Sequence, residues 1–274
     1  MSSSSSSSEE LAGGKVRLDR PGDAVARLTI ARPDARNALD HDVLGAIAEA
    51  MPGLDDGIET RCVILTGEGK AFSAGYDIAG IPEDSFETDA EALVAHPFTV
   101  ALEAVAGHPW PVVGALNGHA LGGGLELALC TDLRICARSA KLGMPPAKLG
   151  LIYGHTGLQR FIDTIGIPRT KELFLTGRNV AAERAEQIGL VHEVVDDDAL
   201  EALSIELAAE VAANAPISMK GNKQAIGTLN SYDRITPEEE RELIALRESS
   251  FASEDMREGI KAFGEKRKPE WRGR

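Results

Sequence analysis

Three consecutive glycines, Gly122, Gly123 and Gly124, stand between an apolar segment at 111–116 and a helix-compatible segment at 125–130. Glycine at such a junction lets the backbone come close to a ligand. N–H groups at the start of a helix favour negative charge, and Glu126 falls on the first turn of that helix. The spacing indicates a site that holds an oxyanion while a carboxylate moves a proton. Taken alone, the stretch is equally typical of a tight turn with a solvated glutamate.

Two nucleotide-binding motifs do not fit the glycines. A P-loop counted from Gly118 would need a lysine at Gly124 and a hydroxyl at Leu125. A dinucleotide fingerprint needs G-x-G-x-x-G, whereas here three adjacent glycines are followed by Leu-Glu-Leu. The stretch therefore predicts neither kind of phosphate site.

A second unit of the same kind precedes the first in the chain. An apolar strand is predicted at 62–66, followed by a glycine-containing turn at 67–70 and by residues 71–78, which include Gly75 and Tyr76. Each unit can offer a backbone N–H, and two such donors converging on one oxygen are the minimum for an oxyanion hole. The pair favours a catalytic site over an isolated turn.

At these residues the chain resembles the crotonase (enoyl-CoA hydratase/isomerase) superfamily. The stretches that carry the likeness run in one register from about 15 to 270, and they are 32–39, 72–78, 117–132, 154–160 and 258–267. The resemblance implies an α/β fold, a spiral of ββα units followed by a C-terminal helical oligomerisation region that forms trimers and often hexamers. The expected division is a disordered Ser-rich tail at 1–14, the spiral core at 15–196 and the helical region at 197–274.

The resemblance also implies roles for individual residues. It places the oxyanion donors at the N–H groups of Tyr76 and Gly123, and the catalytic carboxylate at Glu126. We expect an apolar pocket formed by Leu121, Leu125 and Met144 to raise the pKa of that carboxyl. The positions implied for substrate or CoA are Arg36, Ala74, Gly75, Asp77, Gly122, Met144, Tyr153 and Lys261. CoA would be part of the substrate, and neither a separate cofactor nor a metal is expected.

One position departs from the family pattern. Hydratases carry a second glutamate in a segment that matches 142–146 here, and Pro146 occupies its place. A proline can neither give nor take a proton. Tyr153 and His155 are the candidates for a replacement acid, and His119 in the glycine loop is a candidate similar to His155. The other histidines are expected at surface or helix positions, and these are His41, His96, His108 and His192.

Length, charge and cysteine content are consistent with this class of protein and exclude others. The chain has 274 residues, 43% of them hydrophobic, which is enough for a sizeable core. Its net charge of −14 argues against nucleic-acid binding, because backbone phosphates would be repelled. Three cysteines without a C-x-x-C pair indicate buried free thiols, and no apolar run reaches membrane-spanning length. The serine run at the start lacks the features of a signal peptide, so we expect a cytoplasmic protein.

Periodicity predicts the elements that position these residues. Residues 16–30 read as a strand pair that turns at 20–23, and 83–89 reads as irregular. Further strands are predicted at 111–116 and 133–137. The predicted helices are 40–51, 91–107, 156–161, 199–214, 216–229, 237–250 and 255–266.

The function that follows is an acyl-CoA hydratase, a lyase that adds water to an α,β-unsaturated thioester with Glu126 as its single retained acid/base. Two alternatives stay open. One is another enolate reaction of the same fold, such as thioester or C–C bond hydrolysis, decarboxylation or isomerisation. The other is a non-catalytic protein that binds acyl-CoA. The partners expected are an acyl-CoA thioester and further copies of the chain, as a homotrimer or homohexamer, with no nucleic acid and no membrane.

Overall fold

The core of the protein is built around a large β-sheet. The computed structural model describes residues 8–57, 59–77, 94–230 and 236–270. In these residues the sheet has the order β1-β2-β3-β4-β6-β8-β11, antiparallel from β1 to β3 and parallel from β3 onward. Its strands are β1 (Glu9–Leu11), β2 (Val16–Gly22), β3 (Val25–Ile30), β4 (Cys62–Gly67), β6 (Val112–Leu116), β8 (Leu133–Ala137) and β11 (Glu193–Val195).

A second, smaller sheet carries the glycine units. Its order is β10-β9-β7-β5, with β5, β7 and β9 parallel and β10 antiparallel to β9. The strands are only three residues long, and they are β5 (Ala71–Ser73), β7 (His119–Leu121), β9 (Lys141–Gly143) and β10 (Asn179–Ala181). Short strands of this kind have too few residues to show a periodicity, and the sequence patterns predicted none of them.

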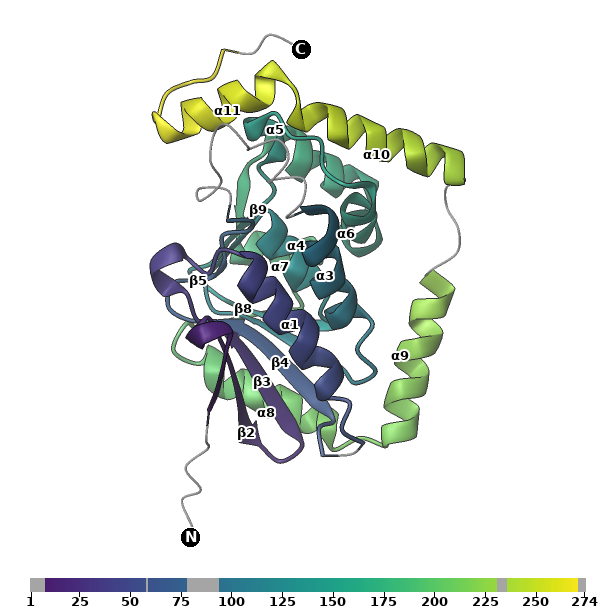
Figure 1. The fold of residues 1–274 in the computed structure, drawn as a ribbon. Helices are drawn as coiled ribbons and strands as arrows, with labels where there is room; N and C mark the ends of the chain where they lie inside the picture. The colour runs from purple at the N-terminus through teal and green to yellow at the C-terminus, as the bar shows by residue number, and fades with distance from the viewer. Residues whose placement is uncertain (1–7, 58, 78–93, 231–235, 271–274) are drawn as a thin grey trace.

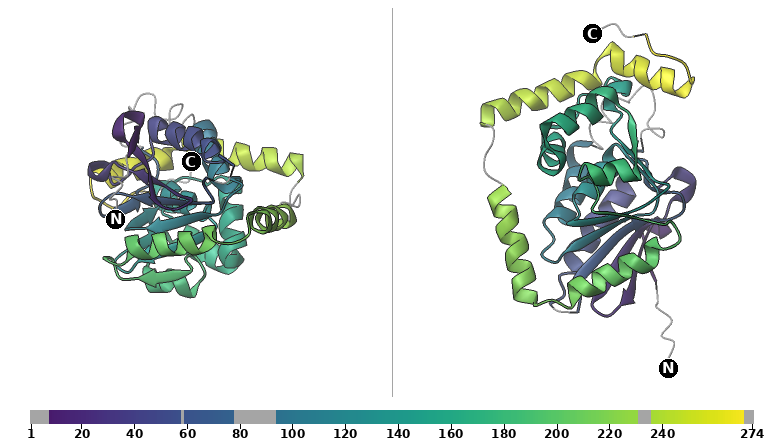
Figure 2. Two further views of the ribbon diagram at one scale, coloured as in Figure 1. Left: turned by 90° about the horizontal axis from the view of Figure 1, so that it is seen from below. Right: turned by 180° about the vertical axis from the view of Figure 1, so that it is seen from behind.

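The helices cover both faces of the large sheet (Figures 1 and 2). In chain order the longer ones are α1 (His41–Gly53), α3 (Thr99–Ala106), α4 (Gly123–Leu129), α5 (Pro146–Leu149), α6 (His155–Thr176), α7 (Ala182–Gln187), α8 (Leu200–Ala212), α9 (Pro216–Asn230), α10 (Pro237–Phe251) and α11 (Glu254–Gly264). Short 3-10 turns lie at Ala12–Gly14 and Pro33–Ala35, and a π-helical turn at Val94–Phe98 leads into α3.

A strand–strand–helix unit repeats along the chain. β4, β6 and β8 each lie in the large sheet, each is followed by a strand of the small sheet, and in the described residues each unit has a helix later in the chain: α3, α4 and α5 respectively. The chain thus winds through both sheets once per unit. This arrangement confirms the predicted spiral of ββα units.

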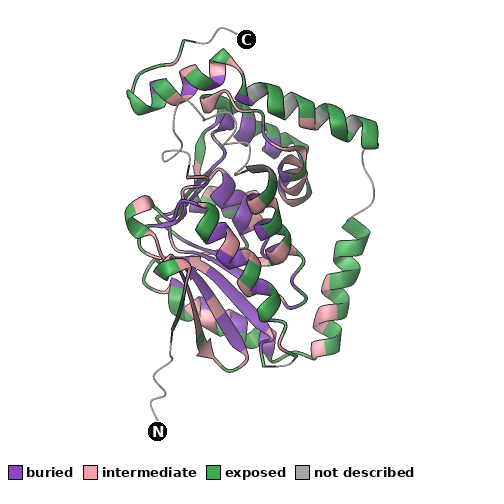
Figure 3. Ribbon diagram, viewed as in Figure 1, coloured by how far each residue is buried: buried purple, intermediate pink, exposed green. Residues whose placement is uncertain are grey.

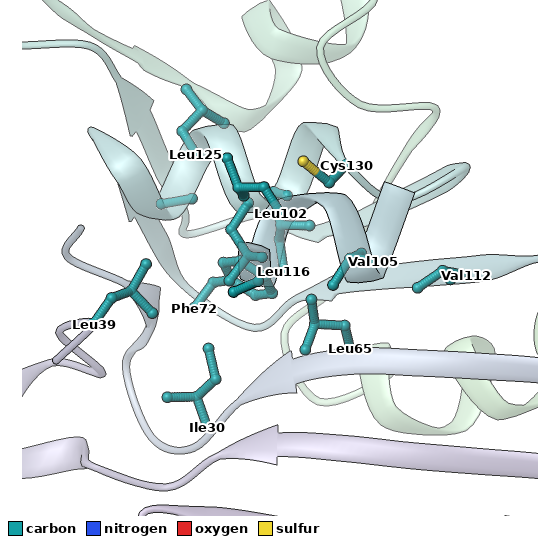
Figure 4. Packing of buried hydrophobic residues seen from close by; sticks show 14 of the residues in the cluster. Ile30, Leu39, Leu65, Phe72, Leu102, Val105, Val112, Leu116, Leu125 and Cys130 are labelled. Atoms are coloured by element: carbon teal, nitrogen blue, oxygen red, sulfur yellow. The ribbon is translucent and has the colours of Figure 1, made fainter. Parts of the chain in front are cut away.

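Alternation along the strands divides the core into two layers. On β4, Val63 and Leu65 pack toward α1 and α3, whereas Cys62 and Ile64 pack toward α8 on the other face. Figure 4 shows Leu65 and Leu116 of the large sheet gathered with Phe72 and the helix residues between them. Because successive side chains point to opposite faces, one strand serves both layers.

Several boundaries differ from the sequence predictions. The chain is already paired at β1, so residues 9–14 do not belong to a disordered tail. The first hairpin turns at Asp23 and Ala24, slightly later than predicted. α6 continues from His155 to Thr176 through a break at Gly166, whose φ is +73°. The segment predicted irregular at 83–89 lies outside the described residues, as do 1–7.

The C-terminal helices confirm the predicted helical region. α9 has no buried residue, and Ile217, Ile226 and Leu229 are 90%, 68% and 73% exposed. In Figures 1 and 2 it runs along the outside of the body, and it is largely exposed in Figure 3. Two ion pairs join it to the body: Lys220 Nζ lies 2.7 Å from Asp55 and Lys223 Nζ 2.6 Å from Asp132.

His108 corrects one of the sequence predictions. Predicted at a surface or helix position, it is only 3% exposed, and burial lowers its pKa to about 4, helped by the charge of Lys223. The three cysteines are buried and free, as predicted. Across the described residues, no helix is both long and apolar enough to cross a membrane.

Candidate active site

The glycine run forms a sharp turn between β7 and α4. Gly122 adopts φ +52° and ψ −127°, a conformation that a side chain would strain, and its carbonyl accepts from Leu125 N and Glu126 N. Its own N–H donates to Gly143 O of β9 at 3.0 Å. α4 begins at Gly123, so Glu126 lies on the first helical turn as predicted.

The two glycine units meet across the small sheet. β5 pairs in parallel with β7, which brings the backbone after Ser73 against the start of α4. A Cβ on Gly75 would lie 2.8 Å from Leu121 O and 3.1 Å from Gly123 N, and one on Gly124 would lie 2.5 Å from Ser73 O. Only residues without a side chain allow this approach. The peptide that joins Gly75 to Tyr76 is therefore held beside the Gly123 amide.

A buried polar network holds the first unit. Asn37 is fully buried and donates to Glu68 O and Ala71 O at 2.9 and 2.6 Å. Ser73 Oγ donates to Asn37 O at 2.8 Å and accepts from Gly75 N at 3.1 Å. Since each of these groups is satisfied, the loop is fixed by hydrogen bonds rather than by apolar packing alone.

The carboxylate of Glu126 is buried, with 3% of the residue exposed. The Tyr153 hydroxyl donates to its Oε2 at 2.5 Å, and Arg160 Nε lies 3.7 Å from its Oε1. Burial raises the pKa of the Glu126 carboxyl above its usual range, while the Tyr153 hydrogen bond and the Arg160 charge offset part of the rise. A raised pKa makes the carboxyl a stronger base, which is a useful property in a group that takes up and releases a proton.

Close packing from α6 encloses the pair. A Cβ on Gly157 would lie 2.9 Å from both Glu126 oxygens and 2.6 Å from Tyr153 Cε1. The Tyr153 ring packs edge-on against Phe174 with centroids 5.4 Å apart. Burial and the charge of Glu126 raise the pKa of the Tyr153 hydroxyl well above its usual value, so it stays protonated and remains a donor.

The Tyr76 ring packs against the start of α4. A Cβ on Gly123 would meet the Tyr76 ring at 3.2 Å, and the ring packs edge-on against Phe98 at 4.6 Å. Tyr76 also acts on the Tyr153 hydroxyl and helps to raise its pKa. Two phenols and one carboxylate therefore lie near one another beside the start of α4.

The other predicted site residues fall into two groups. Met144 is fully buried directly after β9, and Pro146, buried as well, begins α5 where the second carboxylate was sought. Ala74 N donates to Arg36 O at 2.9 Å, so these two positions are adjacent, with the Arg36 side chain exposed.

The remaining predicted site residues contact other parts of the protein. Asp77 pairs with Arg32 at 2.9 Å. His155 Nε2 lies 3.5 Å from Glu240 of α10, which gives it a partner other than Glu126. Lys261 is exposed on α11, a helix that packs on α5.

Sequence reasoning missed Arg160 as a neighbour of Glu126. Its signal was the spacing from Gly157, since residues three apart share one face of a helix and the glycine lets that face approach α4. Asn37 and Ser73 were quoted only as parts of motifs. In the described ranges no group of three or more His, Cys, Asp or Glu could hold a metal ion.

The fold and the turn at α4 define a protein of the crotonase type. The family model described as enoyl-CoA hydratase/isomerase matches residues 20–274, and the chain belongs to that family. A putative enoyl-CoA hydratase/isomerase from Bacillus subtilis, YngF, is 37% identical over 95% of this chain and 99% of its own length. The short-chain-enoyl-CoA hydratase of Clostridium acetobutylicum is 37% identical over 93% and 96%.

A solved structure adds a different activity to the comparison. Methylmalonyl-CoA decarboxylase in complex with 2-nitronate-propionyl-CoA superposes with a TM-score of 0.85 at 27% identity, covering 95% of this chain and 99% of that one. The proteins similar to this chain thus include one named as a hydratase and one named as a decarboxylase.

Proposed function

We propose that this protein is an acyl-CoA hydratase that adds water to an α,β-unsaturated thioester. The observation that carries the proposal is the buried Glu126 carboxyl, one helical turn after Gly123, whose amide meets the Gly75–Tyr76 backbone. The names of the similar hydratases support it. CoA would enter as part of the substrate, with no further cofactor.

The proposed reaction needs only one carboxylate. Glu126 takes a proton from water as the water oxygen bonds to the β-carbon, and the electron pair of the double bond moves onto the thioester oxygen. The N–H groups of Tyr76 and Gly123 would stabilise that enolate, each contributing about 3–4 kcal/mol. Glu126 then returns its proton to the α-carbon. Since the proton taken equals the proton given, Pro146 removes no group that this cycle requires.

The binding of the substrate is the less specified part of the proposal. Arg36 and the backbone at Ala74 and Gly75 lie together and would meet the CoA portion, with Asp77, Gly122, Met144 and Tyr153 nearer the acyl group. Lys261 would reach CoA from α11. Assembly into a homotrimer or homohexamer would cover the exposed apolar side chains of α9, for which the body offers no partner in the described residues.

The direct test replaces Glu126 by its neutral isostere. Glu126→Gln should lower kcat for hydration of a short enoyl-CoA by about 100-fold or more, because general acid–base catalysis contributes that much. The loss of the conjugated thioester's ultraviolet absorbance measures the rate. Glu103→Gln, the same change at an exposed position on α3, is the matched control and should leave the rate unchanged. Full activity in Glu126→Gln would exclude the assignment.

Decarboxylation is the second candidate. It is favoured by the structural match to methylmalonyl-CoA decarboxylase and by Pro146 in the position of a second carboxylate. In that reaction the bond between the α-carbon and its carboxylate breaks, CO2 leaves, and the enolate is protonated at carbon. Mass spectrometry of products from enoyl- and malonyl-type thioesters distinguishes the two. A product heavier by one water supports hydration, and a product lighter by CO2 supports decarboxylation.

A further inference from the structure

The carboxylate of Glu126 is held asymmetrically. Its Oε2 receives a 2.5 Å hydrogen bond from the Tyr153 hydroxyl. Its Oε1 faces Arg160 Nε at 3.7 Å, beyond hydrogen-bond range, and that buried nitrogen has no hydrogen-bond partner among the described residues. The orientation of the carboxylate therefore depends chiefly on one phenol.

The position of that phenol is itself determined by its surroundings. The Tyr153 ring packs edge-on against Phe174, and Gly157 leaves room for the ring and the carboxylate together. Tyr76 acts on the Tyr153 hydroxyl and helps to raise its pKa. Tyr153 precedes α6, Tyr76 follows β5 and Glu126 lies on α4, so three separate elements bring these polar groups together.

We propose that Tyr153 is a positioning residue: its hydroxyl holds the Glu126 carboxylate in one orientation. The proposal rests on the proposed function of Glu126 as the acid/base. It gives Tyr153 a different task from that of a replacement acid. The phenol donates a hydrogen bond throughout and does not transfer its proton.

The charges around Glu126 determine the direction of the expected pH effect. The titratable groups that interact with it are Tyr153 from the segment before α6, Arg160 from α6 and Cys130 directly after α4, and Tyr76 interacts with Tyr153. Burial raises the pKa of Cys130 to about 12, so its thiol is neutral. Arg160 and Tyr153 both favour the carboxylate, and loss of the Tyr153 hydroxyl leaves burial less opposed.

Tyr153→Phe tests the inference because it removes the hydroxyl and keeps the ring. We expect kcat to fall about tenfold to a hundredfold, the range that a hydrogen bond to a charged group supports, with KM changed by no more than about twofold. The acid limb of the kcat/KM profile should move to higher pH, since a base must be ionised to act. Tyr76→Phe, which acts on Glu126 only through the Tyr153 hydroxyl, should move the limb by less.

A matched control separates positioning from packing. Phe174→Leu loosens the ring contact and keeps the Tyr153 hydroxyl, so it should lower the melting temperature while leaving the acid limb in place. If Tyr153→Phe only lowers the melting temperature or raises KM, and its acid limb coincides with that of the wild type, Tyr153 is structural and the proposal fails.

A measurement without turnover distinguishes this inference from the proposed function. Isotope-edited infrared spectra follow the Glu126 carboxyl during a pH titration, with Glu126→Gln identifying its band. A higher apparent pKa in Tyr153→Phe than in the wild type supports positioning even where the wild type hydrates no thioester, and that pair of results would refute the proposed function alone. An unchanged carboxyl pKa overturns the positioning role whichever reaction is catalysed.

Discussion

The start of α4 and the length of α9 are two helical regions with opposite surroundings. In α4 the residues from Gly123 to Ala128 are all buried, and its glycines touch the backbone or side chains of other elements. In α9 no residue is buried, and both of its glycines have open space around them. The same residue type therefore has a steric role in one helix and none in the other.

This difference explains where the protein can carry a reactive group. At α4, contacts from β5, α6 and the Tyr153 segment hold Glu126 from several directions, so a buried carboxyl with a raised pKa is kept in place. At α9, the side-chain hydrogen bonds to the body come from Lys220, Lys223 and Asn230. A precise site needs packed neighbours, and only the first region has them.

The largest effect should come from adding one methyl group to the buried helix. In Gly124→Ala the new Cβ would lie 2.5 Å from Ser73 O, a backbone atom that cannot rotate away. Overpacking of this kind costs about 3 kcal/mol or more of unfolding free energy. Urea denaturation followed by circular dichroism measures the loss. Wild-type stability in this variant would show that the two glycine units are less closely packed than the contacts indicate.

A smaller effect, of opposite sign, should come from Glu126→Gln. Because burial raises the pKa of this carboxyl in the folded state, the folded protein binds the proton more tightly than the unfolded chain. Its contribution to stability is complete below the unfolded pKa and is lost as pH rises through the folded pKa. Glutamine is neutral throughout, so the variant should gain roughly 1 kcal/mol over the wild type at higher pH.

The gain in stability of Glu126→Gln should depend on pH, and this dependence tests the explanation. Unfolding midpoints in urea should coincide for the two proteins in acid, near pH 4, and separate by about pH 8, above the usual range for a glutamate. A constant difference at every pH would mean that packing, and not the charge, distinguishes the two side chains. Together with the loss of turnover, the expected result would show a site that is functional at a cost in stability.

The smallest effect should come from Gly227→Ala in α9. No atom lies within 4 Å of the new Cβ, so the change acts through helix propensity alone and should stabilise α9 by about 0.5–1 kcal/mol. Amide hydrogen exchange within α9 should slow while exchange in the large sheet stays the same. Faster exchange in α9 would show that another surface, such as a second copy of the chain, covers this glycine.

How much could be predicted from the sequence differed between the same two regions. The position of Glu126 on a first helical turn followed from local spacing, as did the C-terminal helices, because their signals lie within about fifteen residues. The contact of Arg160 with Glu126 and the burial of His108 did not, since each depends on an element that arrives from elsewhere in the chain. For His108, α9 contributes the nearby lysines.

The small sheet showed the same limit. β5 and β7 are three residues each and pair across almost fifty positions of sequence, so neither periodicity nor composition marks them. The resemblance to a known family supplied the juxtaposition of Tyr76 and Gly123 that the residues alone suggested only as two similar units. Local sequence patterns predicted most of the longer helices and strands, whereas the contacts between distant segments could be seen only in the structure.

The order β10-β9-β7-β5 has a consequence for how the chain folds during its synthesis. Its strands come from residues 71 to 181, and Tyr153 and Arg160 lie in the chain between β9 and β10. During synthesis from the N-terminus, Glu126 is added to the chain before both of its side-chain partners, Tyr153 and Arg160. Non-local pairing of this kind is slow to form. The Glu126 carboxyl can therefore be enclosed only after the segment from Tyr153 to Arg160 has packed against α4.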